Sequence, residues 1–134
     1  MLICTHFQNT SIVAEVDGRI HGLVSGYLDP EMPEILFVWQ VAVDASLRGK
    51  GVAMGMLKAL LARVNLRHVT MIDTTISPSN TASQNLFKRL ALELRSGMEV
   101  EPYFKRELFG GEAHEDEERY RIGPFKNFFY KEQA

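Results

Sequence analysis

An apolar run at residues 35–43 passes through a glycine-rich turn directly into an amphipathic helix, and this junction constrains the fold most strongly. The run is rich in branched and aromatic side chains, which indicates a central strand buried on both faces. Gly49 and Gly51 lie in the turn, and beyond it apolar residues recur at helical spacing over about 51–64. The sequence therefore predicts a strand, a tight turn and a helix in immediate succession.

The flanking sequence predicts further strands and a second helix. Asp17-Gly18 is a strong hairpin signal because glycine accepts a positive φ without steric cost. Ser77 or Ser79 is expected to cap the second helix, whose apolar stripe is Ala82, Leu86 and Leu90. The remaining strands are expected at 11–16, 19–28 and 69–75, with weaker ones near 97–101 and 119–122. This order predicts an α/β domain, an α+β mixed sheet with a parallel pair inside it.

Length and composition exclude several classes of protein. The 134 residues suit one domain, 1–134, with its own core. The net charge of −2 argues against a general nucleic-acid binder, and no apolar run approaches the roughly 20 residues of a membrane helix. Cys4 is the only cysteine and no signal peptide is evident, so we expect a cytoplasmic protein. The sequence has no His/Cys cluster at metal-ligand spacing, so we expect no metal.

The turn before the first helix has the chemistry of an anion cradle. N–H groups at a helix start have no intrahelical partner and carry the positive end of the helix dipole. Glycines let the backbone approach a bulky anion, and Arg48 and Lys50 add positive charge, which suits a diphosphate. The P-loop pattern and the full dinucleotide fingerprint are both absent. A purely structural turn is the alternative interpretation of this segment alone.

Two segments together resemble the GNAT acetyltransferase family. Arg48-Gly-Lys-Gly51-Val-Ala53 is similar to the family signature [Q/R]-x-x-G-x-[G/A], and the stretch from Asn80 to Leu92 is similar to N-x-x-A-x-x-L-Y-x-x-x-G-F. The resemblance implies the GNAT fold and acetyl-CoA as co-substrate, with the strand pairing to pantetheine and the loop amides holding the pyrophosphate. The cofactor-binding residues it implies are Gln40, Val41, Ala42, Val43, Arg48, Gly49, Lys50, Gly51, Val52, Ala53, Asn80, Ser83 and Phe87. Phe87 departs from the family, where many members have a tyrosine that protonates the leaving thiolate.

Within this family, three stretches resemble the branch that acetylates the side-chain amine of L-2,4-diaminobutyrate for the synthesis of ectoine, a compatible solute of osmotic stress. These stretches are 37–44, 74–80 and 111–125. The N-terminal strand and helices of the family are apparently lacking, since the chain starts almost at the hairpin. The resemblance also implies a homodimer.

Carboxylates suit an acceptor that carries two ammonium groups, and the stretch 112–118 supplies a cluster of them. We expect Glu118 to bind the acceptor and to accept its proton, with His114 as the alternative base. The further candidate acceptor-binding residues are Trp39, Thr75 and Glu115. An indole face attracts an ammonium group, whereas Trp39 in a strand could equally be a core residue and the acidic run a solvated surface.

Two other functions remain open. The first is a GNAT acetyltransferase for another small amine, such as a polyamine, a lysine side chain or an aminoglycoside, because the cradle would be identical. The second is an acyl-CoA-binding domain without turnover, which Phe87 and the short N-terminal region favour. A phosphopeptide or nucleotide module is a more distant third, since no further basic cluster accompanies the loop.

Overall fold

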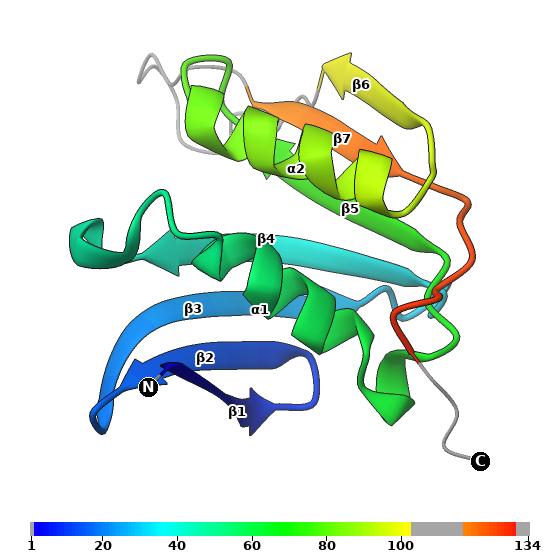
Figure 1. Cartoon of the computed structure of the whole chain (residues 1–134). Coiled ribbons are helices and arrows are strands. Elements are labelled where there is room, and N and C mark those ends of the chain that lie inside the picture. The colour runs from blue at the N-terminus through cyan, green and yellow to red at the C-terminus, as the bar shows by residue number, and fades with distance from the viewer. Residues whose placement is uncertain (1, 103–116, 131–134) are drawn as a thin grey trace, which may run out of the picture.

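A single mixed sheet with two helices on one face forms the molecule in the computed structural model, which describes residues 2–102 and 117–130 (Figure 1). The seven strands lie in the order β1-β2-β3-β4-β5-β7-β6. They are β1 (Leu2–Gln8), β2 (Ser11–Val16), β3 (Arg19–Leu28), β4 (Ile35–Val43), β5 (Met71–Ile76), β6 (Met98–Pro102) and β7 (Glu118–Ile122). The helices are α1 (Val52–Leu61) and α2 (Thr81–Glu93), with 3₁₀ turns η1 (Ala45–Leu47) and η2 (Val64–Leu66).

The central elements agree with the sequence analysis. The hairpin strands and the apolar strand have the predicted limits, and the mixed α/β sheet is confirmed. The expectation that the apolar strand is buried on both faces is wrong beyond Val38, because Trp39, Gln40 and Ala42 are exposed where β4 has no partner strand on its β5 side. β4 and β5 are the predicted parallel pair, joined through α1, while the other neighbouring strands are antiparallel. The edge strand β1, antiparallel to β2, was not predicted, and no helix precedes β2 among the described residues.

Two predicted helix boundaries are wrong for identifiable reasons. α1 ends at Leu61 rather than near 64 because Arg63 takes an extended conformation. Its buried guanidinium donates to the carbonyl oxygen of Ser11 at 2.6 Å, which draws the chain out of the helix toward β2. The cap of α2 is Asn80 rather than Ser77 or Ser79, since the Asn80 side chain accepts a hydrogen bond from the backbone N–H of Ser83 at 3.1 Å.

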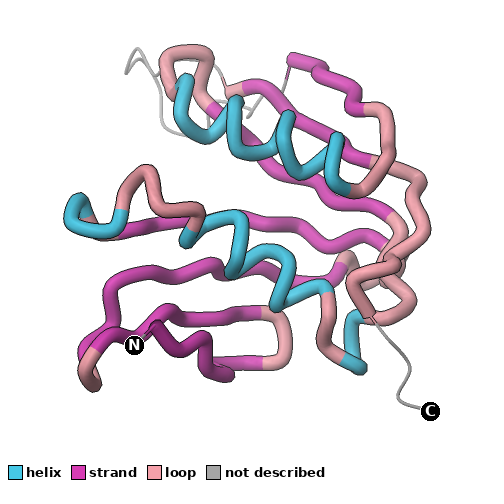
Figure 2. The backbone as a smooth tube through the Cα atoms, in the orientation of Figure 1, coloured by secondary structure: helices cyan, strands magenta, loops and turns pink. Residues whose placement is uncertain are grey.

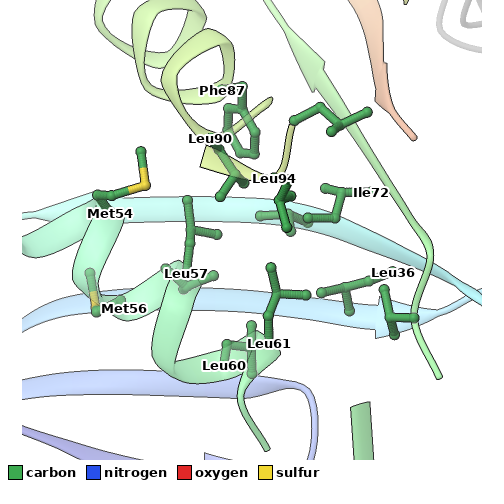
Figure 3. Close-up of a cluster of buried hydrophobic side chains, with 14 of the residues drawn as sticks. Leu36, Met54, Met56, Leu57, Leu60, Leu61, Ile72, Phe87, Leu90 and Leu94 are labelled. Atoms are coloured by element: carbon green, nitrogen blue, oxygen red, sulfur yellow. The ribbon is translucent and has the colours of Figure 1, made fainter. Parts of the chain in front are cut away.

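The core lies between the sheet and the two helices (Figure 3). α1 contributes Leu57, Leu60 and Leu61 to this core, and α2 contributes Phe87 and Leu90. The helices contact each other and share an ion pair between Lys58 and Glu93 at 2.9 Å. Both helices therefore cover the same face of the sheet, and in the described part of the chain no helix covers the opposite face (Figure 1).

Candidate functional site

β4 and β5 diverge toward their carboxyl ends, and this divergence defines the candidate site (Figure 1). Their parallel pairing begins at Ile35 and Met71 and ends at Val38 and Thr74, although β4 continues to Val43. At this last pair the Thr74 hydroxyl donates a buried hydrogen bond of 2.7 Å to the carbonyl oxygen of Val38. Beyond it, Trp39 lies on a bulge, and residues 40–43 pair with β3 on one side and with no described strand on the other. That open side of β4 can pair with an extended ligand, as the pantetheine prediction for Gln40 to Val43 requires.

Trp39 sits on a bulge of β4 at the start of the opening. The register with β3 shifts there, because Gly26 lies opposite Val38 while Ser25 lies opposite Gln40. The Trp39 side chain is 61% exposed, and its indole N–H donates to the Ser25 hydroxyl at 3.0 Å. The bulge thus places the indole at the point where β4 and β5 separate, outside the core.

The glycine-rich turn has the backbone geometry of the predicted cradle. Gly49 and Gly51 have φ values of +77° and +73°, and Gly51 is the residue at which α1 begins. No side chain caps this helix start, and its first turn carries no acidic residue. Arg48 and Lys50 are exposed beside it. Free backbone donors, flanking cations and the absence of a competing carboxylate fit a diphosphate.

A hydrogen-bonded pair braces the entrance to this turn. Nδ1 of the His21 ring lies 2.7 Å from a carboxylate oxygen of Asp44, to which its N–H donates, and the backbone N–H of Asp44 donates to the carbonyl oxygen of His21 at 2.8 Å. Both contacts tie the end of β4 to β3 immediately before η1. The turn therefore starts from a fixed strand end rather than from a free loop.

The amino terminus of α2 lies at the same end of the sheet as the carboxyl ends of β4 and β5 (Figure 2). Asn80 is exposed and Ser83 half-buried at this helix start, close to the carboxyl end of β5. Phe87 is only 1% exposed and belongs to the core cluster with Leu57 and Leu90. The structure thus brings Asn80 and Ser83 toward the cradle edge but places Phe87 in the core.

The helix-free face of the sheet carries the other predicted acceptor residues. Side chains alternate along a strand, so Thr75 projects away from the core-facing Ile76 and onto the face where Trp39 reaches Ser25. Trp39 and Thr75 therefore flank the opening from the same face.

On this face Asp73 forms a bidentate pair with Arg121 of β7, with both N–O distances at 2.7 Å. This hydrogen bonding with Asp73 raises the pKa of Arg121.

Glu118 occupies the first position of β7, opposite Ile76 at the carboxyl end of β5. Alternation places Glu118 on the helix-covered face with Tyr120, and hence on the opposite face from Trp39 and Thr75. Burial and, next, the charge of Glu118 raise the pKa of Tyr120, so its phenol stays neutral. The predicted residues His114 and Glu115 lie outside the described residues.

Sequence reasoning missed the residues that support this site. Ser25, Thr74 and the His21–Asp44 pair all act through contacts between strands far apart in sequence. Pairing the predicted strands 19–28 and 35–43 as a hairpin would place Ser25 near Trp39. The bulge that sets their exact register, however, has no signal in the sequence.

Neither a metal site nor a membrane-spanning helix is found among the described residues. Across residues 2–102 and 117–130, no group of three or more His, Cys, Asp or Glu side chains is placed to hold a metal ion. No helix in this described part of the chain is long and apolar enough to cross a membrane.

Comparisons with known proteins agree with this geometry. A model of the acetyltransferase (GNAT) family matches residues 3–91, well over half of the chain. The chain is 46% identical over 126 residues to an L-2,4-diaminobutyric acid acetyltransferase of Bordetella parapertussis, and 41% identical over 124 residues to one of Halalkalibacterium halodurans. These matches cover 93% and 92% of the chain but 68% and 66% of the relatives, so the chain spans about two thirds of their length.

A solved structure is also similar over nearly the whole chain. It is a diaminobutyrate acetyltransferase from Paenibacillus lautus in complex with its substrate L-2,4-diaminobutyric acid and coenzyme A. The TM-score is 0.82 at 40% identity, covering 96% of the chain and 75% of that structure. The ribosomal-protein-S18-alanine N-acetyltransferase of Escherichia coli, at 15% identity and a TM-score of 0.62, shares the fold.

Proposed function

This chain belongs to the GNAT acetyltransferase family, and we propose that it transfers the acetyl group of acetyl-CoA to the side-chain amine of L-2,4-diaminobutyrate. The observation that carries the proposal is the 40% identity, over 96% of the chain, to a diaminobutyrate acetyltransferase whose structure holds both that substrate and coenzyme A. The opening between β4 and β5, with the cradle at its edge, provides the geometry that such a reaction needs.

The chain divides the reaction between the two faces of the sheet. On the helix-covered side, the amides of the turn at 48–53 hold the diphosphate, and β4 from Gln40 to Val43 pairs with the pantetheine arm. On the helix-free side, Trp39 and Thr75 border the place where the amine enters. The thioester is thereby held in the opening, with its carbonyl carbon accessible to the amine.

The transfer itself is a direct displacement. The neutral amine forms the new C–N bond to the acetyl carbon as the C–S bond breaks, and the sulfur leaves with the electron pair. The attacking nitrogen loses a proton, for which Glu118 is the proposed acceptor and His114 the alternative. Because Glu118 lies on the helix-covered face and the amine is proposed to enter from the other face, the proton would reach Glu118 through water in the opening between β4 and β5. Deprotonation of a lysine-like ammonium at pH 7 costs roughly 4 kcal/mol, and the second ammonium of the substrate reduces this cost because like charge lowers the pKa of its neighbour.

The leaving sulfur does not depend on Phe87. A phenyl ring has no proton to donate, and this ring is buried in the core. A thiolate with a reference pKa of about 8.5 is a tolerable leaving group near neutral pH, so water or the Ser83 hydroxyl suffices as proton donor.

The test is acetyl-CoA turnover, followed by thiol release, with L-2,4-diaminobutyrate beside ornithine, lysine and a polyamine. We expect kcat/KM for diaminobutyrate to exceed that for the other amines by at least tenfold. Glu118→Gln is expected to lower it about 10²-fold, the size of a general-base contribution, whereas Glu99→Gln on exposed β6 should not change it. Preference for another amine would contradict the substrate, and coenzyme A binding without any turnover would favour the non-catalytic alternative.

We also propose a cytoplasmic homodimer, as the family resemblance implies. The aromatic stretch from Phe125 to Tyr130 does not carry this proposal, because it packs on its own chain. Phe125 is buried, and the Asn127 amide donates to the carbonyl oxygens of Leu61 and Leu66 at 2.8 and 3.1 Å. Sedimentation is expected to give the mass of two chains, and a single-chain mass at all concentrations would contradict the dimer.

A further inference from the structure

Trp39 is an exposed aromatic side chain at the mouth of the opening, and among the described residues one polar contact orients it. The side chain is 61% exposed, so packing does little to fix its ring. An indole N–H is a donor only, and here it donates to the Ser25 hydroxyl at 3.0 Å. Because the ring projects from a bulge, its torsion angles are not set by a regular strand neighbour either.

The hydroxyl that receives this bond is itself held in place. Ser25 lies opposite Ser11 in the register of β2 and β3, and their hydroxyl oxygens are 3.2 Å apart. Ser25 accepts from the indole, so its own proton is free to be donated to Ser11, which is completely buried. Trp39, Ser25 and Ser11 thus form a row of side chains across three adjacent strands, from the opening into the sheet.

The direction of this row has a consequence for the substrate. Trp39 and Thr75 border the opening from the helix-free face, where the amine is proposed to enter. An aromatic face attracts an ammonium group only when the cation lies over the ring within about 6 Å of its centre. A ring free to rotate would spend much of its time edge-on to the opening, so its orientation decides how well it can bind a cation.

We propose that Ser25 is a positioning residue that holds the Trp39 indole face toward the amine substrate. This inference depends on the proposed function, because it assigns Ser25 a role in binding that substrate. The alternative is that the bond only stabilises the pairing of β3 and β4. The two differ in outcome, since a structural role alone would not separate binding of the amine from binding of acetyl-CoA.

Steady-state kinetics of Ser25→Ala supplies the first test. We expect KM for the amine to rise about fivefold, which corresponds to a lost hydrogen bond of about 1 kcal/mol, while KM for acetyl-CoA and kcat stay within twofold. Ser25→Thr keeps a hydroxyl and should restore most of the affinity. Ser96→Ala is the matched control, because it also removes one hydroxyl hydrogen bond, to Gly97 at 2.9 Å, in the connection between α2 and β6.

Trp39 is the only tryptophan in the sequence, so fluorescence reports this side chain alone. Ser25→Ala is expected to lower the anisotropy of the tryptophan emission in the free protein, and Ser96→Ala to leave it unchanged. In a Trp39→Phe background, which already lacks the N–H donor, Ser25→Ala should cause no further rise in KM for the amine. Non-additivity of this kind is the signature of a direct interaction.

Three results would overturn the inference: unchanged anisotropy in Ser25→Ala, equal rises in both KM values, or additive effects with Trp39→Phe. Its failure is distinguishable from failure of the proposed function. If the unaltered protein acetylates no amine, the proposed function is wrong and the inference falls with it. If the unaltered protein turns over and Ser25→Ala has the same KM for the amine, only the inference is wrong.

Discussion

Valine in place of Gly51 is expected to raise KM for acetyl-CoA about 100-fold while leaving the protein folded. Gly51 has a φ of +73° at the N-cap of α1, within the cradle, a conformation that a β-branched side chain adopts only with strain. A side chain there would meet no atom within 4 Å, so the cost falls on the backbone and not on packing. The peptide must rotate to relieve the strain, which turns its N–H groups away from the diphosphate.

The magnitude follows from the backbone hydrogen bonds that the diphosphate would no longer receive. A hydrogen bond from a backbone N–H to a charged group contributes about 1.5–3 kcal/mol, so losing one or two of them corresponds to roughly 100-fold in affinity. Isothermal titration with coenzyme A measures this loss independently of turnover. Circular dichroism and urea unfolding establish that the variant is still folded.

Gly55→Ala is the matched control for this prediction. Gly55 lies one turn further along the same helix, is exposed, has no positive φ and has open space around it. Alanine in a helix interior is favoured over glycine by about 0.5–1 kcal/mol, so the variant should unfold at higher urea concentration with unchanged affinity for coenzyme A. An unchanged KM in Gly51→Val would mean that the turn is structural and that the cofactor binds elsewhere.

The central part of the fold is readable from sequence because its signals are local. The hairpin follows from Asp17-Gly18 and the alternation around it, and β4 from its branched and aromatic residues. The cradle follows from the glycines at a strand–helix junction, and their positive φ values agree with that reasoning. These features depend on residues a few positions apart, where steric and capping rules act directly.

The missed features depend instead on contacts between distant residues. α1 stops at Leu61 because Arg63 binds the carbonyl oxygen of Ser11, 52 residues earlier. No residue near Arg63 in the sequence indicates this contact. The splitting of β4 from β5 after Val38 and Thr74 is likewise a property of the sheet as a whole. The acceptor site is the hardest part to predict from sequence. It combines side chains from several strands, and the strand register decides onto which face of the sheet each of them projects.

The ion pair between Asp73 and Arg121 offers a test of what holds β7 against β5, the strand that borders the opening. It joins β5 to β7 with two hydrogen bonds of 2.7 Å, and the Asp73 side chain is only 10% exposed. Arg121→Met would leave a largely buried carboxylate without its partner. Breaking a buried pair in this way destabilises proteins by about 3–5 kcal/mol, and because Arg121 is 29% exposed we expect about 3 kcal/mol.

A second ion pair of β7, between Arg119 and Glu101, supplies the matched control. Arg119 and Glu101 pair across β7 and β6 at 2.6 Å, but the Glu101 side chain is 55% exposed. Arg119→Met is therefore expected to cost at most about 1 kcal/mol, because water solvates the remaining carboxylate. Both variants remove an arginine from the same face of the same strand, so the difference between them in urea unfolding reports the burial of the remaining carboxylate together with the second hydrogen bond of the Asp73 pair.

A double variant separates the cost of an unpaired charge from the value of the pair. Asp73→Leu with Arg121→Met removes both charges and leaves apolar groups, so it should be less destabilised than Arg121→Met alone. If the single variant is no less stable than the double, then water reaches Asp73 freely. In that case the packing of α2 on Ile72 and Ile122, rather than the ion pair, ties β7 to β5.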